Sequence, residues 1–207
     1  SSTDPFWAIP VGRGLDQVVR VLGNCGVHRL AVVDTEDKNR VVGLCTQSAV
    51  LRAIHANADK LGTLAAVPMG TFVNAERPAV VVNSTATARE ALAILLDNKI
   101  TGAPIVDDTT SAVVGSLSVS ELRSLGKMKP GDEGRLLALN VVDFVKEIRK
   151  TTSLAPTTVR ETDSFSAALA LVVAAGVHRV FIVDGDSKPL GVATLTDFLK
   201  LIAAACC

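Results

Sequence analysis

The chain has 207 residues and no formal net charge, because 21 basic side chains are matched by 21 acidic ones. Apolar residues make up 48% of it, enough for a real core, whereas aromatic residues make up 3% and tyrosine is absent. This composition offers no basic surface for nucleic acid or a membrane and few aromatic platforms for single-stranded bases. No apolar run approaches the length of a bilayer span. We therefore expect no nucleic-acid partner and no membrane partner.

The side chains that usually carry catalysis are scattered along the sequence. The four cysteines have the spacing of neither a disulfide framework nor a zinc motif; they are Cys25, Cys45, Cys206 and Cys207. The histidines are far apart, and the sequence contains no nucleophile elbow and no P-loop. We expect no enzyme, no catalytic residue, no metal and no cofactor, and we place the protein in a reducing compartment, the cytoplasm or the nucleus.

Three stretches of the chain repeat one pattern, and together they cover most of its length. Gly43, Gly115 and Gly191 recur at nearly equal spacing, and the phrase Gly-Val-His-Arg stands at both 26–29 and 176–179. The repeated stretches are residues 14–54, 85–125 and 163–202. Such internal similarity indicates one structural unit used three times.

The first repeat predicts a helix, two strands and a closing helix. Apolar residues at positions 15, 18, 19 and 22 have helical spacing. Residues 30–33 and 41–45 are short apolar runs that predict strands, and the polar residues between them predict a turn. Residues 6–10, ahead of the helix, predict one more short strand.

The second and third repeats predict the same elements in the same order. The second gives strands at 79–82, 105–106 and 113–117 and a helix with apolar residues at 88, 91, 92, 95 and 96. The third gives strands at 157–159, 180–183 and 190–195 and a helix with apolar residues at 165, 168, 169 and 172. Between them, residues 127–133 predict a loop and residues 136–149 a helical stretch.

These motifs resemble the CBS (cystathionine-β-synthase) domain family over nearly the whole chain. Residues 191–197 read Gly-Val-Ala-Thr-Leu-Thr-Asp, similar to the family pattern of glycine, two apolar residues, Ser/Thr, any residue, Ser/Thr and Asp. The order of the repeats and the linker at residues 64–72 resemble the γ regulatory subunits of AMP-activated and sucrose-non-fermenting-type kinases. In that family four repeats pair into two modules, and each module can hold adenine nucleotides in its central cleft.

The resemblance implies an α/β fold of three tandem CBS (βαββα) repeats, with boundaries at residues 1–62, 63–130 and 131–207. The second and third repeats would form a paired Bateman module with the ligand in their cleft. The first repeat would lack a partner within this chain. It would pair with an N-terminal repeat, a second copy of the chain or another protein, and its free face would be an exposed apolar patch.

The third repeat carries the most complete candidate site. The carboxylate of Asp197 could accept both ribose hydroxyls, and the hydroxyls of Thr194 and Thr196 could donate to ribose or phosphate. The Arg179 guanidinium offers a planar donor fork for phosphate, and His178 adds a donor beside it. The alternative is structural, because a Thr followed by an acid also begins ordinary helices, and the His-Arg pair could lie on the surface.

The other two repeats depart from the pattern. In the second, Glu121 stands where Asp is expected, and the resemblance would place Thr87, Ile100 and Thr101 along the cleft shared with the third. In the first, the motif ends in Ala49, so no carboxylate is available for ribose. Its His28 and Arg29 remain as candidate phosphate donors for a neighbouring cleft.

The resemblance predicts a non-catalytic regulatory protein that binds AMP, ADP or ATP and modulates a protein partner. The partner would be the other subunits of a Ser/Thr kinase complex or a second copy of the chain. Two alternatives stay open. One is a scaffold or interaction protein with vestigial clefts, and the other is a module that binds S-adenosylmethionine.

Overall fold

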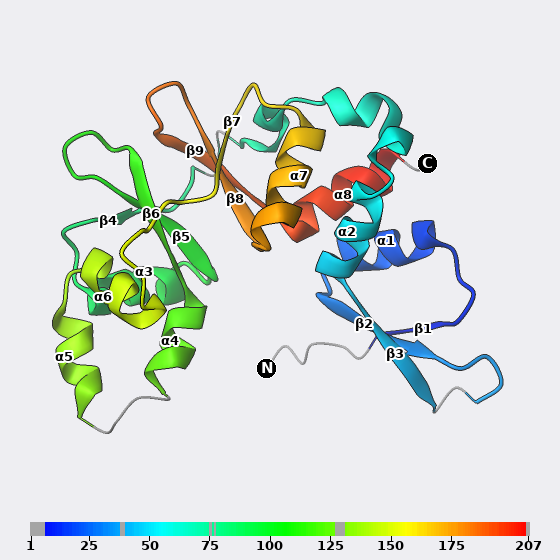
Figure 1. Ribbon diagram of the computed structural model, residues 1–207, viewed down its shortest axis with the longest axis horizontal. Coiled ribbons are helices and arrows are strands. Elements are labelled where there is room, and N and C mark those ends of the chain that lie inside the picture. Colours follow the sequence, from blue (N-terminus) through cyan, green and yellow to red (C-terminus); the bar gives the residue numbers. More distant parts are fainter. Residues whose placement is uncertain (1–6, 38–39, 75, 77, 127–130, 206–207) are drawn as a thin grey trace. The chain divides into compact units, whose positions relative to one another are not determined.

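The computed structural model describes residues 7–37, 40–74, 76, 78–126 and 131–205. They form three three-stranded sheets with the orders β1-β2-β3, β4-β5-β6 and β7-β8-β9 (Figure 1). In each sheet the first strand runs parallel to the second. The α/β architecture of three repeats predicted from the sequence is confirmed. Among the described residues, no helix is both long enough and apolar enough to cross a bilayer.

Each repeat contains a short strand, a helix, a pair of strands and a closing helix. The first consists of β1 (Ala8–Pro10), α1 (Leu15–Asn24), β2 (Arg29–Val33), β3 (Val41–Thr46) and α2 (Gln47–His55). The second consists of β4 (Val82–Asn83), α3 (Ala88–Asp97), β5 (Gly102–Val106), β6 (Val113–Ser118) and α4 (Val119–Leu125). The third consists of β7 (Thr158–Arg160), α7 (Phe165–Ala175), β8 (Arg179–Val183), β9 (Pro189–Thr194) and α8 (Leu195–Ala205). The predicted elements are all present, with ends shifted by a few residues; Phe6 lies outside the described residues.

Each of the two segments between the repeats contains two helices among its described residues. Two 3-10 helices, η1 (Ala58–Ala66) and η2 (Met69–Phe72), follow the first repeat. The prediction of a loop at residues 127–133 is wrong for residues 132 and 133, because α5 (Asp132–Ala138) begins there. Residues 127–130 lie outside the described residues. The single helical stretch expected at 136–149 is two helices, α5 and α6 (Val141–Arg149). The break comes at Asn140, whose backbone forms a β-bridge with Thr87 and whose side chain caps α6.

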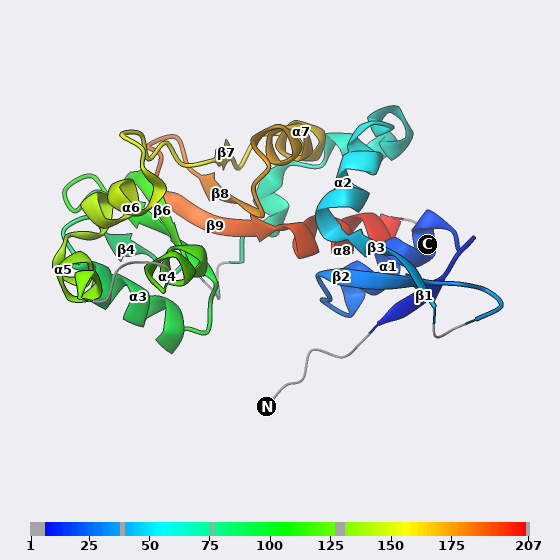
Figure 2. The ribbon, with the colours of Figure 1, turned by 60° about the horizontal axis from the view of Figure 1, so that its bottom comes forward.

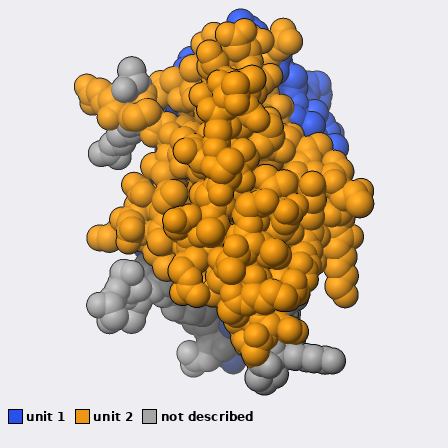
Figure 3. Space-filling view, turned by 90° about the vertical axis from the view of Figure 1, so that its left-hand side faces the viewer, with its two compact units in different colours: residues 1–72, 162–180, 193–207 blue, residues 73–161, 181–192 orange. Residues whose placement is uncertain are grey.

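The chain divides into two compact units that do not follow the repeat boundaries. Unit 1 comprises residues 1–72, 162–180 and 193–207, and unit 2 comprises residues 73–161 and 181–192 (Figure 3). Both helices of the third repeat therefore belong to unit 1, together with the whole first repeat. Most of the strand residues of the third repeat belong to unit 2, together with the whole second repeat.

In unit 1 the helices of the first repeat pack against those of the third. Helix α1 lies along α8, and α2 contacts both α7 and α8 (Figures 1 and 2). Three aromatic rings, Phe72, Phe165 and Phe198, fill the core beside them with centroids 5.2–6.4 Å apart. The helices of the first repeat thus pack on α7 and α8 of the third repeat. The expectation that the repeat which pairs with the first one lies outside this chain stays a prediction.

The crossing of α1 over α8 depends on Gly23. A Cβ atom at this position would lie 2.9 Å from the backbone carbon of Leu199 and 3.0 Å from the backbone nitrogen of Lys200. We expect Gly23→Ala to lower the free energy of unfolding by about 1–3 kcal/mol, because the helices must separate. Urea unfolding measures the change. The matched control is Gly134→Ala in α5, where a Cβ meets nothing within 4 Å; this change is expected to stabilise by up to about 1 kcal/mol. Equal effects of the two changes would contradict the packing argument.

In unit 2 the second repeat forms its core with α5 and α6. The buried cluster joins α3, β5 and β6 to residues that follow the repeat in sequence, among them Leu136, Val141, Phe144 and Leu154. Strand β6 is also tied to the third repeat, since the N–H of Val113 donates to the carbonyl of Ser187 at 2.9 Å. Within this unit, the second and third repeats, whose association the sequence predicts, are thus joined directly by a backbone hydrogen bond.

The sheet of the first repeat has an exposed apolar edge strand. On β3, Val41, Val42 and Leu44 are 54%, 46% and 66% exposed. Exposed apolar side chains gathered on one strand often mark an interaction surface.

Candidate functional site

One backbone hydrogen bond recurs in all three repeats and brings the predicted site residues together. In each repeat, the residue that opens the closing helix donates its N–H to a carbonyl just ahead of the middle strand. The pairs are Gln47 with His28 at 3.1 Å, Val119 with Thr101 at 3.1 Å, and Leu195 with His178 at 3.2 Å. In each repeat, the residues just ahead of the middle strand therefore lie beside the start of the closing helix, which in the third repeat carries the Ser/Thr-x-Ser/Thr-Asp motif.

In the third repeat, Asp197 and Thr194 are hydrogen-bonded to each other. One carboxylate oxygen of Asp197 accepts from the N–H of Thr194 at 2.8 Å and from its hydroxyl at 2.6 Å. The N–H of Asp197 in turn approaches the Thr194 hydroxyl oxygen at 3.4 Å. This reciprocal arrangement is a helix cap, so the structural interpretation of the motif applies here. The second carboxylate oxygen bonds to none of the described residues, and the side chain is half-buried.

The hydroxyl of Thr196 is held by a glutamine of the first repeat. Gln47 is only 4% exposed, and its Nε2 donates to Thr196 Oγ1 at 2.9 Å. The same nitrogen lies 3.3 Å from the carbonyl of Leu22 and 3.1 Å from that of Val27, and Oε1 lies 3.4 Å from Nδ1 of His28. A single buried amide therefore joins the third repeat's motif to the first repeat.

We expect Gln47→Leu to destabilise unit 1 by about 1–3 kcal/mol, because the buried carbonyls of Leu22 and Val27 lose their donor. Urea unfolding followed by circular dichroism checks this. Asn57→Ala is the control, since the Asn57 amide makes an exposed hydrogen bond to Ala53. Its expected effect is within about 0.5 kcal/mol. A Gln47→Leu protein as stable as the control would show that this network carries little energy.

His178 is exposed and Arg179 is half-buried at the start of β8. His178 lines a cavity of ≈ 150 Å³ in unit 1 with eight other residues: Ser48, Leu51, Arg52, Val172, Val173, Gly176, Val177 and Leu195. Ligand pockets typically measure about 300–1,000 Å³, so this cavity is too small for a whole nucleotide. Asp197 and Thr194 are not among its lining residues.

In the second repeat, the carboxylate of Glu121 is already engaged within the protein. Its side chain is 6% exposed, and one oxygen accepts from Nε of Arg149 at 2.8 Å. The other oxygen accepts from the N–H of Ser118 at 2.7 Å, while the Arg149 guanidinium also donates to the carbonyl of Ser116. Arg149 of α6 thus bonds to the carboxylate that would otherwise be available to accept from ribose hydroxyls.

The remaining second-repeat candidates, Thr87, Ile100 and Thr101, also belong to unit 2. Thr87 caps α3, because its side chain accepts from the N–H of Glu90 and the Glu90 carboxylate accepts from its backbone. Hydrogen bonds from the backbone N–H and the hydroxyl of Thr87 lower the pKa of Glu90. Ile100 packs at the edge of the second-repeat core, and Thr101 is exposed.

In the first repeat, His28 and Arg29 are both exposed. Arg29 pairs with Thr46 in the β2–β3 register, so it lies next to the first-repeat motif, and His28 contacts Gln47. Ala49 donates its N–H to the Thr46 hydroxyl and provides no acceptor for a sugar.

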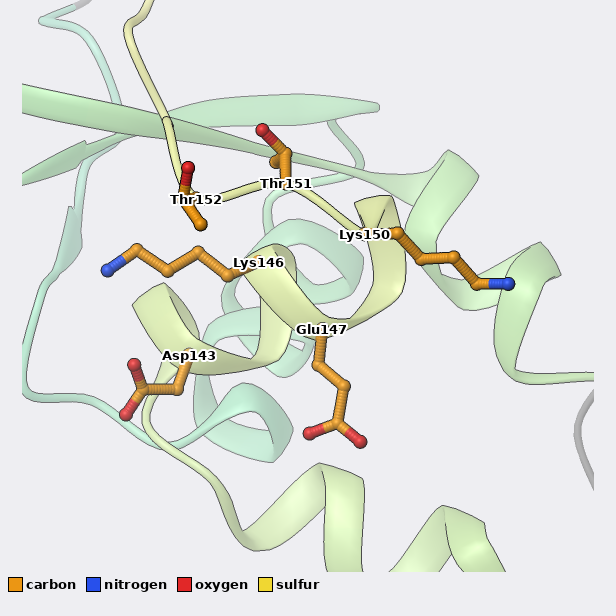
Figure 4. A pocket seen from close by; sticks show the side chains of 6 residues that line it. All are labelled: Asp143, Lys146, Glu147, Lys150, Thr151 and Thr152. Carbon is orange, nitrogen blue, oxygen red and sulfur yellow. The ribbon is translucent and has the colours of Figure 1, made fainter.

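A wide, open pocket of ≈ 430 Å³ lies along the exposed side of α6. Its lining residues are Asp143, Lys146, Glu147, Lys150, Thr151 and Thr152 (Figure 4). The ammonium groups of Lys146 and Lys150 point to opposite sides of the helix. The two cations therefore do not converge on one phosphate.

The family profile of the CBS domain matches residues 2–56, 73–126 and 145–204. The chain belongs to the CBS-domain family. The three matched segments correspond to the three repeats, so the family predicted from the glycine spacing and the motif at residues 191–197 is confirmed.

Known CBS proteins resemble the chain over most of its length. The 5′-AMP-activated protein kinase subunit gamma of Dictyostelium discoideum is 26% identical over 85% of this chain and 31% of its own length. Protein MJ1225 of Methanocaldococcus jannaschii has a TM-score of 0.70 at 16% identity, over 94% of this chain and 66% of that one. CBSX2 of Arabidopsis thaliana, solved in complex with AMP, has a TM-score of 0.50 at 25% identity, over 67% of this chain and 96% of that one. The chain spans between 31% and 46% of the length of the first curated relatives it matches.

Sequence reasoning missed two residues, Gln47 and Arg149, that bond to predicted site residues: Gln47 to Thr196, and Arg149 to Glu121. Gln47 stands at the variable position of the motif, where the other repeats have Val119 and Leu195. A polar side chain at a position that is apolar in the other copies was the available signal. Arg149 lies 28 residues from Glu121 and had no comparable signal.

Proposed function

We propose that this protein is a non-catalytic regulatory CBS protein that binds an adenine nucleotide, AMP, ADP or ATP, through its third repeat. Asp197 would accept the ribose hydroxyls, Thr194 and Thr196 would contact ribose or phosphate, and Arg179 with His178 would contact phosphate. The proposal extends to the partner, which we take to be the other subunits of a Ser/Thr kinase complex.

The observation that carries the proposal is the half-satisfied carboxylate of Asp197. One oxygen holds the helix cap, and the other bonds to none of the described residues. A carboxylate has about four acceptor sites, so the cap leaves capacity for a vicinal diol. His178 is bonded through its carbonyl to the residue two positions before Asp197, which keeps the phosphate donors near the sugar acceptor.

The first and second repeats lack a free carboxylate at the motif position, which supports the third repeat as the nucleotide site. Glu121 is closed off by Arg149, and the first repeat has Ala49 in place of an acid. The complex of CBSX2 with AMP, at 25% identity, supports an adenine nucleotide as the ligand class. The match to a kinase γ subunit supports the choice of partner.

The regulatory mechanism we propose is linkage. A nucleotide bound at Asp197 contacts Thr196, and Thr196 is bonded to Gln47 of the first repeat. A ligand that fits one arrangement of this contact better than another shifts the population towards that arrangement. The free thiols of Cys25 and Cys45 support a reducing location, the cytoplasm or the nucleus.

Isothermal titration calorimetry of the intact chain with AMP, ATP and S-adenosylmethionine tests the proposal. We expect saturable binding of AMP or ATP with a stoichiometry of one. Binding of S-adenosylmethionine in place of the nucleotides would assign the site to that ligand instead. The absence of binding for all three would leave a scaffold protein whose motif serves only as a helix cap.

A further inference from the structure

Gln47 is a buried polar side chain of the first repeat that contacts the nucleotide site proposed for the third. It is 4% exposed, and it belongs to unit 1 together with Thr194, Thr196 and Asp197. An amide offers two hydrogens on its nitrogen and accepts only through its oxygen. The contacts of a buried amide therefore decide the direction of each hydrogen bond around it.

The orientation of the Gln47 amide follows from the groups that surround it. Nε2 lies 3.1 Å from the carbonyl oxygen of Val27 and 3.3 Å from that of Leu22, and both oxygens can only accept. The opposite orientation would place the amide oxygen against these two carbonyls. Oε1 lies 3.4 Å from Nδ1 of His28, a ring nitrogen that can carry a hydrogen. The NH₂ group of Gln47 is therefore the one that faces Thr196.

This orientation leaves the hydroxyl hydrogen of Thr196 available to a ligand. The NH₂ group only donates, so Oγ1 of Thr196 is the acceptor in the 2.9 Å contact with Gln47. A hydroxyl has one hydrogen, and Thr196 donates it to none of the described residues. The residue is half-buried at the second position of α8. Towards a ligand, Thr196 is therefore a hydrogen-bond donor.

The hydroxyl of Thr194 has the opposite polarity. It donates its hydrogen to the carboxylate of Asp197 at 2.6 Å, so towards a ligand its oxygen can only accept. The carboxylate also only accepts. Sugar hydroxyls can donate to both groups, whereas an ionised phosphate only accepts and needs a donor. The acceptors at Thr194 and Asp197 thus suit the sugar, and the donor at Thr196 suits the phosphate.

We propose that Gln47 is a positioning residue that makes the third-repeat site prefer phosphorylated nucleosides. By donating to Oγ1, Gln47 turns the hydroxyl hydrogen of Thr196 away from itself and towards the phosphate of the ligand. Without this contact the hydroxyl rotates freely and its hydrogen has no fixed direction. The first repeat thereby takes part in the selectivity of a site whose ligand contacts lie in the third. This role of Gln47 rests on the proposed function, since its ligand is the nucleotide held by Asp197.

Calorimetric titration of the intact chain with AMP and with adenosine tests this role, and the readout is the ratio of the two affinities. Thr196→Val removes the hydroxyl and should weaken AMP about tenfold or more, the value of a hydrogen bond to a charged group, with little effect on adenosine. Thr196→Ser keeps the hydroxyl and should keep the ratio. Gln47→Leu should lower the preference for AMP by about threefold to tenfold, because the hydroxyl remains but is no longer directed.

Two comparisons separate this role from a general loss of stability. If Gln47 acts through Thr196, adding Gln47→Leu to Thr196→Val should lower the preference for AMP no further. Val33→Ala truncates a side chain that is 6% exposed in the core of the first repeat. Val33 lies at the last position of β2, whereas Gln47 bonds to His28 just ahead of the first. This control should leave the ratio unchanged.

The outcomes distinguish the role of Gln47 from the proposed function. A wild-type chain that binds neither AMP nor adenosine would remove both. If the wild-type chain binds AMP and Gln47→Leu leaves the ratio unchanged, only the role of Gln47 is overturned. The same holds if Gln47→Leu acts equally with and without the Thr196 hydroxyl, if Val33→Ala lowers the ratio as much, or if the wild-type chain prefers adenosine.

Discussion

Replacing Arg149 by alanine is expected to lower the free energy of unfolding by about 3 kcal/mol, the low end of the range for breaking a buried ion pair. The change leaves the carboxylate of Glu121, which is 6% exposed, with only its bond from the Ser118 N–H. It also removes the donor to the carbonyl of Ser116. Arg149 itself is 34% exposed, which places the loss at the low end. Urea unfolding of the two proteins measures the difference.

Two further variants show whether the buried charge is the cause. Glu121→Gln combined with Arg149→Ala removes the charge and should recover a large part of the lost stability. Arg135→Ala breaks the pair with Glu147, whose side chains are 57% and 41% exposed. Exposed pairs contribute about 0–1 kcal/mol, so this loss should be much smaller. If the two arginine variants lost equal stability, burial of Glu121 would not be the reason.

The second large effect concerns ligand affinity at Asp197. We expect Asp197→Asn to weaken AMP binding by about tenfold to a hundredfold, the value of one hydrogen bond to a charged acceptor. The asparagine carbonyl can still accept from Thr194 and keep the cap, whereas its NH₂ group cannot accept from a ribose hydroxyl. Calorimetric titration gives the affinity, and the unfolding curve shows whether the cap survives.

A comparison of the affinities for adenosine and AMP separates the contribution of the sugar contacts from that of the phosphate contacts. Asp197→Asn should weaken both ligands, whereas Arg179→Ala should weaken AMP and spare adenosine. Asp186→Asn, in the exposed turn between β8 and β9, is the control and should leave both affinities unchanged. An Asp197→Asn protein that is folded and binds AMP like the wild type would remove Asp197 from the site.

The local structure of each repeat could be predicted from the sequence because its causes are local. The spacing of Leu15, Val18, Val19 and Leu22 defines one face of α1, and the same spacing recurs in α3 and α7. His178 lies beside the residues of the closing helix because it precedes β8, Leu195 follows β9, and these two consecutive strands are neighbours in the sheet.

The packing between repeats could not be predicted in this way. Gln47 and Thr196 are 149 residues apart, and a glutamine at a variable position gives no sign of its partner. Glu121 was interpreted as a replacement for a ribose acceptor, since nothing in the sequence pairs it with Arg149. The break at Asn140 within a helical pattern reflects a bridge to Thr87, a tertiary contact that overrides helical periodicity.

The segment at residues 139–144, which contributes Val141 and Phe144 to the core of the second repeat, has a consequence for how the protein can be made. When synthesis has reached residue 126, all residues that form the helices and strands of the second repeat are in the chain, but Val141, Phe144 and Val145 of its core have yet to be added. Until they emerge, the apolar face of α3 is open to solvent, a state prone to aggregate. A shortened chain that stops at residue 126, where the second family match ends, would carry that defect permanently.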